Sequence, residues 1–203
     1  MSEINLQGLN KLLVHQVHEF GEWIGFETRN KYQIMNESKI LLGFAAEQQK
    51  GILGFLLRQY LGHWRKFDVH FFNIDRQVAY VAHHPFRWFF ERIEVRDASG
   101  KYLGAIQKRF SILSKRFDIE NEKGMTILEV ASPIWRIWTF TFMSRNQKVA
   151  EVRKKWSGLL SEALTDRDNF EVEFVDRNMT IAEKSLVMVS SVFVDLLYFE
   201  RKR

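Results

Sequence analysis

The chain contains no cysteine and only two prolines among its 203 residues. Without cysteine it cannot form a disulfide, a thiolate metal site or a cysteine nucleophile, and this composition suits a reducing cytosol. It also has only 11 glycines, which together with the scarcity of proline argues against long disordered tails. No basic stretch followed by an apolar run opens the sequence, so we expect no signal peptide. We therefore expect one cytoplasmic domain over residues 1–203, with 1–24 as a lead-in segment.

The familiar catalytic motifs are also missing. The sequence has no nucleophile elbow, no P-loop, no G-x-G-x-x-G pattern and no H-E-x-x-H zinc motif. It gives no sign of bond-making chemistry, so we predict that the protein is not an enzyme. The net charge of +5 points instead to an anionic partner, which is a membrane surface or a nucleic acid. Because no nucleic-acid reading motif accompanies this charge, a nucleic acid is the weaker of the two interpretations.

Aromatic residues are abundant, with 18 phenylalanines, 6 tryptophans and 5 tyrosines. Aromatic side chains favour strands and large cores. Residues 116–120 and 170–174 alternate apolar and charged side chains, as half-buried strands do. Helix-like spacing of apolar residues also predicts short helices over 9–20 and 157–164. The composition and these patterns together favour a mainly β protein.

Short polar turns separate the predicted strands. After the first, they recur about every 23 to 25 residues, which is the span of one β-hairpin with its connection. The turns lie at 36–39, 73–76, 97–100, 121–124 and 144–147. We therefore expect at least ten strands in sequential hairpins, which form a barrel or a sandwich.

The last segment, residues 180–199, is apolar on nearly every face. Such a helix either spans a membrane or lies buried inside a protein. A span needs about 20 mostly apolar residues, whereas the uninterrupted apolar run covers only 186–199 and contains Asp195. An aspartate at the centre of a span costs about 3 kcal/mol, but a hydrogen-bond donor can satisfy it inside a protein. We therefore predict a buried helix over 180–200, with transmembrane insertion of 186–199 the less favoured alternative. Its structural residues are Leu186, Val189, Phe193, Asp195 and Leu197.

One long block of the sequence, residues 155–170, reads KWSGLLSEALTDRDNF. The further blocks are 12–16, 25–32, 44–47, 117–122 and the final helix. Together these blocks resemble the phospholipid scramblase family, whose domain has the Tubby C-terminal-like fold. The resemblance covers essentially the whole chain. It implies a closed antiparallel β-barrel of about twelve strands around a central C-terminal hydrophobic α-helix. It also implies a membrane-associated protein that moves phospholipids between the leaflets of a bilayer.

The chain departs from this family at its cysteine clusters. Family members often carry clusters of cysteines that are acylated, whereas this chain has aromatic-rich stretches at 84–90 and 133–138 in their places. The proline-rich N-terminal extension of the animal proteins is also absent. Anchoring through an acylated cysteine of this chain is therefore excluded.

The acidic stretch that the family is proposed to use for calcium is altered as well. A calcium-binding loop of the EF-hand kind needs a glycine at position 6 and a bidentate carboxylate at position 12. Counted from Asp166, these positions hold Glu171 and Arg177. Asp166, Asp168 and Asp176 therefore predict at most a weak calcium site, and the alternative is that they are simply solvated. Calcium is the only cofactor that the sequence suggests.

An apolar connection, residues 51–66, lies between two predicted strands, where loops are normally polar. Aromatic and aliphatic side chains beside cations are typical of a segment at a membrane interface. Trp88 and Trp135 extend this surface if the barrel gathers its loops at one end. The predicted lipid contacts are Leu53, Phe55, Leu56, Arg58, Tyr60, Trp64, Arg65, Lys66, Trp88 and Trp135. The alternative is that these aromatic residues fill the interior around the central helix.

The basic clusters at 108–109, 115–116 and 153–155 allow two interpretations. Such clusters are most often the solvated face of a strand, but the resemblance also allows a phosphoinositide or phosphate site. Two functions therefore stay open: a scramblase-like protein that moves phospholipids, or a binding module for anionic headgroups or a protein partner. In either case we expect a peripheral protein on the cytoplasmic side whose partners are the phospholipid surface and its anionic lipids.

Overall fold

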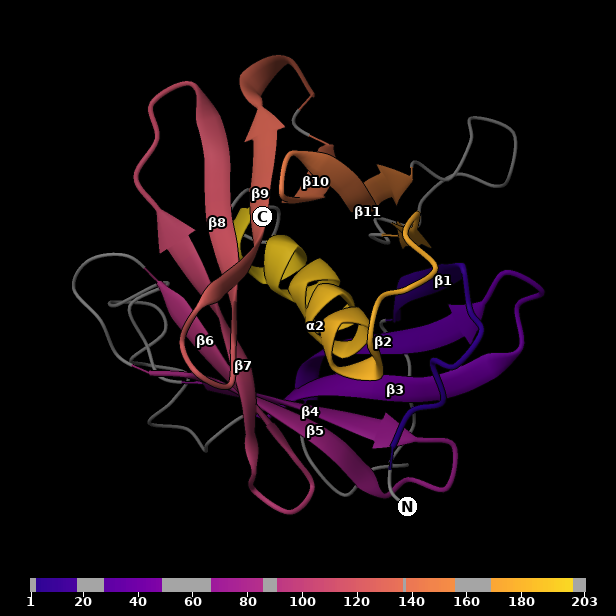
Figure 1. Ribbon diagram of the computed structural model, residues 1–203. Coiled ribbons are helices and arrows are strands. Elements are labelled where there is room, and N and C mark those ends of the chain that lie inside the picture. The colour runs from indigo at the N-terminus through magenta and orange to yellow at the C-terminus, as the bar shows by residue number, and fades with distance from the viewer. Residues whose placement is uncertain are drawn as a thin grey trace.

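The computed structural model describes residues 3–17, 28–48, 67–85, 91–136, 138–155 and 169–198. These residues form twelve strands, one short 3-10 helix and one long helix (Figure 1). The strands are β1 (Lys11–Val17), β2 (Thr28–Asn36), β3 (Leu41–Gln48), β4 (Phe67–Asn73), β5 (Val78–His84), β6 (Arg92–Asp97), β7 (Tyr102–Arg109), β8 (Ser114–Asn121), β9 (Thr126–Pro133), β10 (Thr139–Ser144), β11 (Gln147–Lys155) and β12 (Asn169–Phe174). The helices are η2 (Ile134–Arg136) and α2 (Ile181–Tyr198).

Every strand pairs antiparallel with its neighbour in sequence, and β1 pairs with β12 to close the barrel. The closing ladder joins Leu12 to Val172 and Val14 to Phe170. Closure leaves no strand with an unpaired edge, so the sheet satisfies its own backbone hydrogen bonds. The predicted barrel of about twelve strands is thus confirmed.

The prediction of a helix over residues 9–20 is wrong. Residues 11–17 are strand β1, in which alternate side chains are buried. Leu12, Val14 and Gln16 face the interior, so the period is two and not that of a helix. The pairing of β1 with both β2 and β12 overrides the helix-like spacing of its leucines. The helix expected over 157–164 lies outside the described residues.

Four of the five predicted turns share one construction. In each, an Asn or Asp accepts backbone hydrogen bonds from the third and fourth residues after it, through its main-chain and side-chain oxygens respectively. The third residue has a positive φ, as at Lys39 (61°) and Gly124 (74°). The initiating residues are Asn36, Asn73, Asp97 and Asn121. A side chain that caps its own turn explains why these residue types recur at the hairpins.

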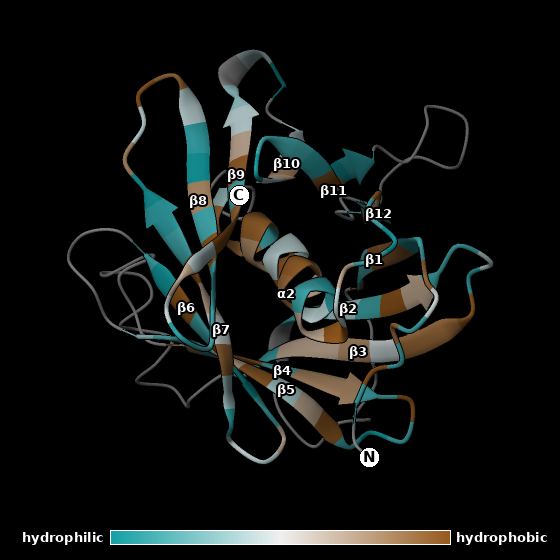
Figure 2. Ribbon diagram, in the orientation of Figure 1, coloured by the Kyte–Doolittle hydropathy of each residue, from teal (hydrophilic) through white to brown (hydrophobic). Residues whose placement is uncertain are grey.

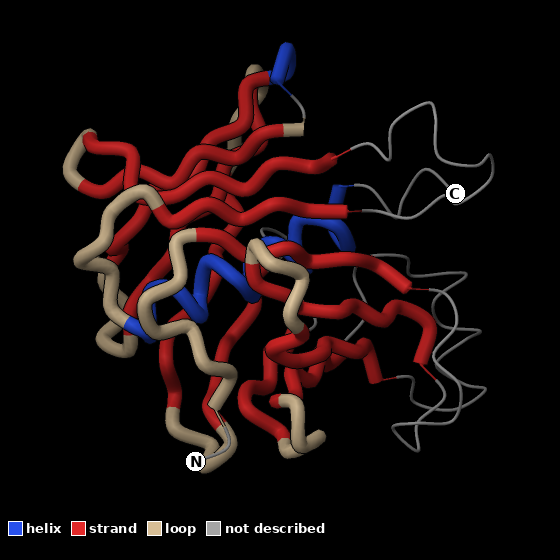
Figure 3. Tube along the Cα trace, turned by 90° about the vertical axis from the view of Figure 1, so that its right-hand side faces the viewer, coloured by secondary structure: helices blue, strands red, loops and turns tan. Residues whose placement is uncertain are grey.

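Helix α2 runs through the interior of the barrel, surrounded by strands (Figures 1 and 3). Its residues from Lys184 to Leu197 are all buried, and Leu186, Val189, Phe193 and Leu197 expose at most 5% of their surface. Figure 2 shows the helix hydrophobic over most of its length. The predicted central helix is therefore confirmed, and it forms the middle of the hydrophobic core.

Close packing between the helix and β7 depends on Gly104. A Cβ at this position would lie 2.1 Å from the backbone oxygen of Glu120 and 3.1 Å from Leu186 Cδ1. Gly104 also has a φ of 153°, which L side chains rarely adopt. On another side, the ring of Phe193 meets the ring of Phe117 edge to face, with centroids 6.4 Å apart.

Polar contacts fix both ends of α2. Thr180 and Glu183 form a capping box, in which the Glu183 backbone N donates to Thr180 Oγ1 and the Thr180 backbone N donates to Glu183 Oε2. Lys184 Nζ donates to the backbone oxygen of Leu9, over a distance of 2.8 Å. Near the other end, the Tyr32 hydroxyl donates to Asp195 Oδ2 at 2.7 Å, so the predicted donor for this buried carboxylate exists. Among the described helices, none is long and apolar enough to cross a bilayer.

The two ends of the barrel differ in their connections. We call the end with the five tight turns the turn end, and α2 begins there. We call the opposite end the loop end; there residues 110–113 join β7 to β8, η2 joins β9 to β10, and α2 finishes. The inner space at the loop end, bordered by the last residues of β7 and β11 and the first of β8, is the mouth of the barrel.

Candidate membrane-contact surface

The loop end carries a patch of exposed, large apolar side chains. Phe110, Ile112 and Leu113 lie in the β7–β8 loop and are 74%, 80% and 65% exposed. Trp135 of η2 is 75% exposed. Ser114 pairs with Pro133, so the end of the β7–β8 loop lies beside the start of η2. We call these four side chains the apolar patch. The β7–β8 loop stands out as hydrophobic at the upper left of Figure 2.

Cations flank this patch on the strands that enter and leave it. Arg109 and Arg116 face outwards on β7 and β8, and Arg136 is exposed next to Trp135. Arg109 is held by Asp118 and Glu120, with Nε 2.7 Å from Asp118 Oδ2. Because these acids offset the charge of Arg109, it is Arg116 and Arg136 that supply the positive charge beside the apolar bulk. This combination is typical of an interfacial membrane site.

Inside the mouth, three lysines project from β7, β8 and β11, which belong to one run of neighbouring strands. Lys108, Lys115 and Lys154 are half-buried, and each follows the inward alternation of its strand. Lys115 Nζ lies 4.7 Å from the centre of the Tyr198 ring, and Lys108 Nζ lies 5.8 Å from it. Lys154 Nζ lies 5.1 Å from the centre of the Trp138 ring. We call these three residues the lysine arc.

The end of α2 explains part of this arrangement. A helix leaves its last carbonyls without partners within the helix and has partial negative charge there, which favours nearby cations. No basic residue lies in the last turn of α2, so the strands supply the positive charge. Burial, and to a smaller extent the charge of Glu91, raise the pKa of Tyr198, so its phenol stays neutral at physiological pH.

The other side of the mouth is lined with buried amides and carboxyls. Gln16 Nε2 donates to Asn30 Oδ1 at 3.3 Å, and Asn30 Nδ2 donates to Glu47 Oε2 at 2.8 Å. All three side chains are nearly inaccessible, and they extend the polar lining begun by Tyr32 and Asp195. The interior thus changes from apolar in the middle of the barrel to polar at the loop end.

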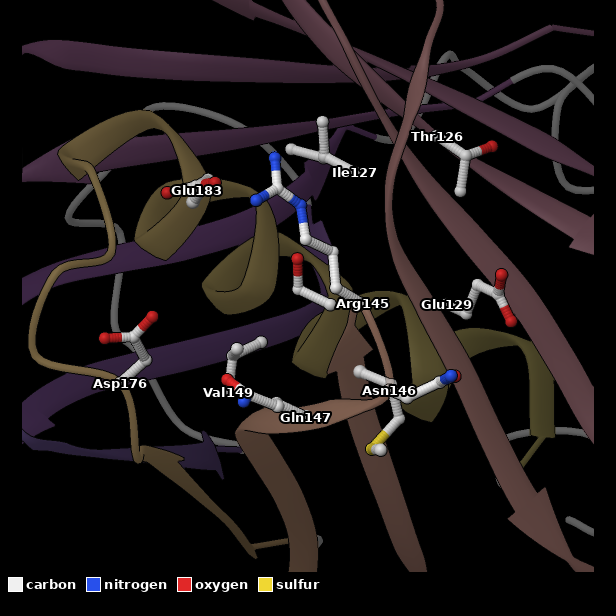
Figure 4. Close-up of a pocket in the computed structure, with 11 residues that line it drawn as sticks. Thr126, Ile127, Glu129, Arg145, Asn146, Gln147, Val149, Asp176 and Glu183 are labelled. Atoms are coloured by element: carbon white, nitrogen blue, oxygen red, sulfur yellow. The ribbon is translucent and has the colours of Figure 1, made fainter.

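At the turn end, the chain lines a cavity of about 510 Å³ between the β8–β9 and β10–β11 hairpins and the start of α2. Figure 4 shows the Arg145 side chain pointing into this cavity between Ile127 and Glu183. Glu183 already serves the capping box, and the walls are mostly polar side chains at the ends of β9, β10 and β11. This cavity offers neither the exposed apolar bulk nor the gathered lysines of the loop end.

The predicted site residues fall in different places. Of the predicted lipid contacts, Trp135 is an exposed member of the apolar patch. The others, from 51–66 and Trp88, lie outside the described residues, so their role stays a prediction.

Asp166 and Asp168 of the predicted calcium site also lie outside the described residues. Asp176 follows β12 at the turn end, where its Oδ1 accepts from the Asn178 backbone N. Residues 169–174 are an extended strand, not the compact loop of an EF-hand. Within the described residues, no group of three potential ligands could hold a metal ion.

Sequence reasoning missed the apolar patch except for Trp135. It singled out the basic clusters that contain the three lysines, but not which members of each cluster face the interior. A signal for the patch was present, because Phe110, Ile112 and Leu113 stand together between two basic pairs. For the lysines the basic clusters were visible, but nothing local showed which residues face inwards. Which member of a basic pair faces inwards depends on the strand register, and a shift of one residue would exchange them.

Comparison with known proteins identifies the family to which the chain belongs. The family model described as Scramblase matches residues 3–201. Human phospholipid scramblase 2 is 27% identical over 98% of this chain, which covers 70% of that protein. Mouse and human phospholipid scramblase 1 are each 27% identical, and the chain spans 63% and 64% of their lengths. No solved structure matches the chain. The match over nearly all of its length shows that the chain belongs to the phospholipid scramblase family.

Proposed function

We propose that the chain is a peripheral membrane protein that moves phospholipids between leaflets, and that it docks through its loop end. The observation that carries this proposal is the apolar patch, with three large side chains on one short loop and a tryptophan beside it. Exposed apolar clusters flanked by cations mark contacts with membranes or partners. Of these two alternatives, the family relationship favours a membrane over a protein partner. Moving a lipid breaks no covalent bond, so the proposed activity is not enzymatic.

The barrel is proposed to act without releasing its helix. Extraction of α2 would expose a series of large apolar side chains at about 2 kcal/mol each. They include Leu186, Val187, Met188, Val189, Val192, Phe193, Val194, Leu196 and Leu197. Their total exceeds the roughly 5–15 kcal/mol that stabilises a whole domain. Lipid movement by the folded barrel therefore has to start from the membrane surface, where inserted loops disturb headgroup packing.

A second candidate function is a binding module on the cytoplasmic face that holds anionic headgroups without moving lipid. The lysine arc supports this alternative, because lysines gathered in one place suit a phosphate group. Both functions predict binding to anionic vesicles, and only the first predicts leaflet exchange.

A leaflet-exchange assay distinguishes the two functions. The purified chain is added to liposomes that carry a fluorescent phospholipid, and the reagent dithionite bleaches only the outer leaflet. If the chain scrambles lipid, bleaching proceeds beyond the outer half, and calcium is tested by repeating the assay with a chelator. Bound protein that leaves the inner half protected under all these conditions would reject the first function and favour the second.

A further inference from the structure

The β7–β8 loop holds a serine in the middle of the apolar patch. Ser111 lies between Phe110 and Ile112, which are 74% and 80% exposed. Its own side chain is half-buried, and its hydroxyl shares a hydrogen bond with the Ser114 hydroxyl at 2.7 Å. A charge placed on Ser111 therefore lies inside the surface that is proposed to meet the membrane.

The backbone of this loop is tied down less than the turns at the other end of the barrel. In four of those turns, an Asn or Asp accepts backbone hydrogen bonds that close the turn. By contrast, no backbone hydrogen bond joins residues 110–113 to any other part of the chain that the structure describes. A short exposed segment without such bonds changes its conformation at low cost. Ser111 can therefore be presented to an enzyme that binds its substrate in an extended form.

Basic residues flank this serine on both sides. Lys108 and Arg109 stand three and two residues before Ser111, and an isoleucine follows it directly. The second basic pair, at 115–116, comes after the loop. Basophilic protein kinases select serines with this pattern, because acidic groups in their substrate groove pair with the cations. Lys108 is engaged by Glu91, whereas the Arg109 side chain is 44% exposed and is the cation that a kinase meets first.

We propose that Ser111 is a phosphorylation site for a basophilic protein kinase, and that its phosphorylation releases the barrel from the membrane. The kinase transfers the γ-phosphoryl group of ATP to Ser111 Oγ. An Oγ–P bond replaces the Oγ–H bond, the proton passes to solvent and ADP leaves. This inference rests on the proposed function for the surface that meets the membrane, and it adds the regulation of that surface.

The charge of a phosphoserine opposes docking in two ways. It carries about −1.5 to −2 charges at pH 7, which offsets the positive charge that Arg116 and Arg136 supply beside the patch. It also has to lose water when the neighbouring apolar side chains insert. Each charge near an anionic membrane changes affinity roughly five-fold. Phosphorylation should therefore weaken binding to anionic vesicles by about ten- to twenty-five-fold.

Phosphorylation of the full chain tests the modification site. The chain is incubated with ATP and the catalytic subunit of cAMP-dependent protein kinase, which selects this pattern, and the phosphate is mapped by mass spectrometry. We expect phosphate on Ser111, lost in Ser111→Ala and kept in Ser114→Ala. Ser157 also follows two basic residues, and it lies outside the described residues. Phosphate on Ser157 or elsewhere, with none on Ser111, would overturn the proposal.

Vesicle co-sedimentation with matched variants tests the effect on docking. Ser111→Glu adds a charge, whereas Ser111→Gln adds the same bulk without it, and Ser38→Glu adds the charge to an exposed serine at the turn end. Ser111→Glu should bind anionic vesicles roughly five-fold more weakly, and the other two variants should lose less than two-fold. The difference between Glu and Gln at 111 should narrow at high salt. Equal losses in Ser111→Glu and either control would overturn the proposal.

The phosphorylated wild-type chain gives an answer even if the variants fold poorly, because it is modified after folding. If it binds anionic vesicles as tightly as the unmodified chain, the docking surface stands and the regulation by Ser111 is rejected. If the unmodified chain binds no anionic vesicles, the proposed function fails, and phosphate mapping still reports whether Ser111 is modified.

Discussion

The same strands are connected differently at the two ends of the barrel. At the turn end, compact turns capped by Asn or Asp close the hairpins, and the apolar side chains that stay exposed, such as Ile40 and Ile74, stand singly on separate turns. At the loop end, Phe110, Ile112 and Leu113 share one loop beside Trp135, and charged side chains line the interior. The difference teaches that the turn end is closed by self-capped turns, whereas the loop end gathers exposed apolar side chains on one short loop.

The largest loss of stability is expected from a change in α2, because this helix runs through the interior from one end of the barrel to the other. Phe193→Ala removes a fully buried ring that contacts Phe117, so urea unfolding should show a loss of about 3–5 kcal/mol. The control is Phe110→Ala, which removes the same ring from an exposed site and should change stability by less than about 0.5 kcal/mol. Similar small losses in both variants would mean that α2 is not packed inside the barrel.

Replacing exposed apolar side chains with serine at each end tests most directly which end of the barrel binds membranes. The variant with Phe110, Ile112 and Leu113 all changed to serine should bind anionic vesicles at least ten-fold more weakly, because each inserted side chain contributes up to about 1.5–3 kcal/mol. The control is Ile40→Ser with Ile74→Ser, which removes 61% and 60% exposed side chains at the turn end. If the control variant loses as much binding in co-sedimentation, the two ends are equivalent and the docking proposal fails.

A smaller effect is expected at the buried carboxylate of Asp195. Asp195→Ala leaves the Tyr32 hydroxyl without its acceptor, which costs about 1–3 kcal/mol, whereas Asp195→Asn keeps an oxygen for this donor. Urea melts should therefore rank the alanine variant below the asparagine variant. Adding Tyr32→Phe to Asp195→Ala should recover part of the loss, and equal stability of the two single variants would indicate a solvated carboxylate.

The smallest effect is expected from the cap of α2 at the turn end. Thr180→Ala removes the Oγ1 that accepts from the Glu183 backbone N, so stability should fall by about 1 kcal/mol. Thr126→Ala, at the same end but capping no helix, should change it by less than about 0.5 kcal/mol. Neither variant should alter vesicle binding once folded. Weaker binding by folded Thr180→Ala would show that the turn end contributes to membrane contact.

Much of the fold followed from local patterns in the sequence. The hairpin turns were visible as short polar stretches between strands, and in four of them an Asn or Asp caps the turn. The burial of α2 followed from its length and from Asp195, whose charge suits a protein interior with a donor better than a bilayer. In contrast, the spacing of Leu9, Leu12 and Leu13 indicated a helix, and only pairing with both β2 and β12 makes this segment a strand.

The candidate site was harder to predict than the fold. Trp135 was expected to extend a membrane surface if the barrel gathers its loops at one end, with the barrel interior as the alternative, and it is exposed. The basic clusters that contain the lysine arc were visible in the sequence, but the inward orientation of its members could not be predicted, because they lie on three strands whose faces are set by register. Their assembly also requires Tyr198, which reaches them only because the helix occupies the barrel.

The central claim is that the folded barrel meets the membrane with its loop end. Because the chain has no cysteine, a single cysteine introduced at position 112 or position 74 can carry an environment-sensitive dye without background. With anionic vesicles, the dye at 112 should shift to the blue and be quenched by lipids brominated in their chains, while the dye at 74 should stay in water. A dye at 74 that enters the bilayer while the dye at 112 remains in water would contradict the account.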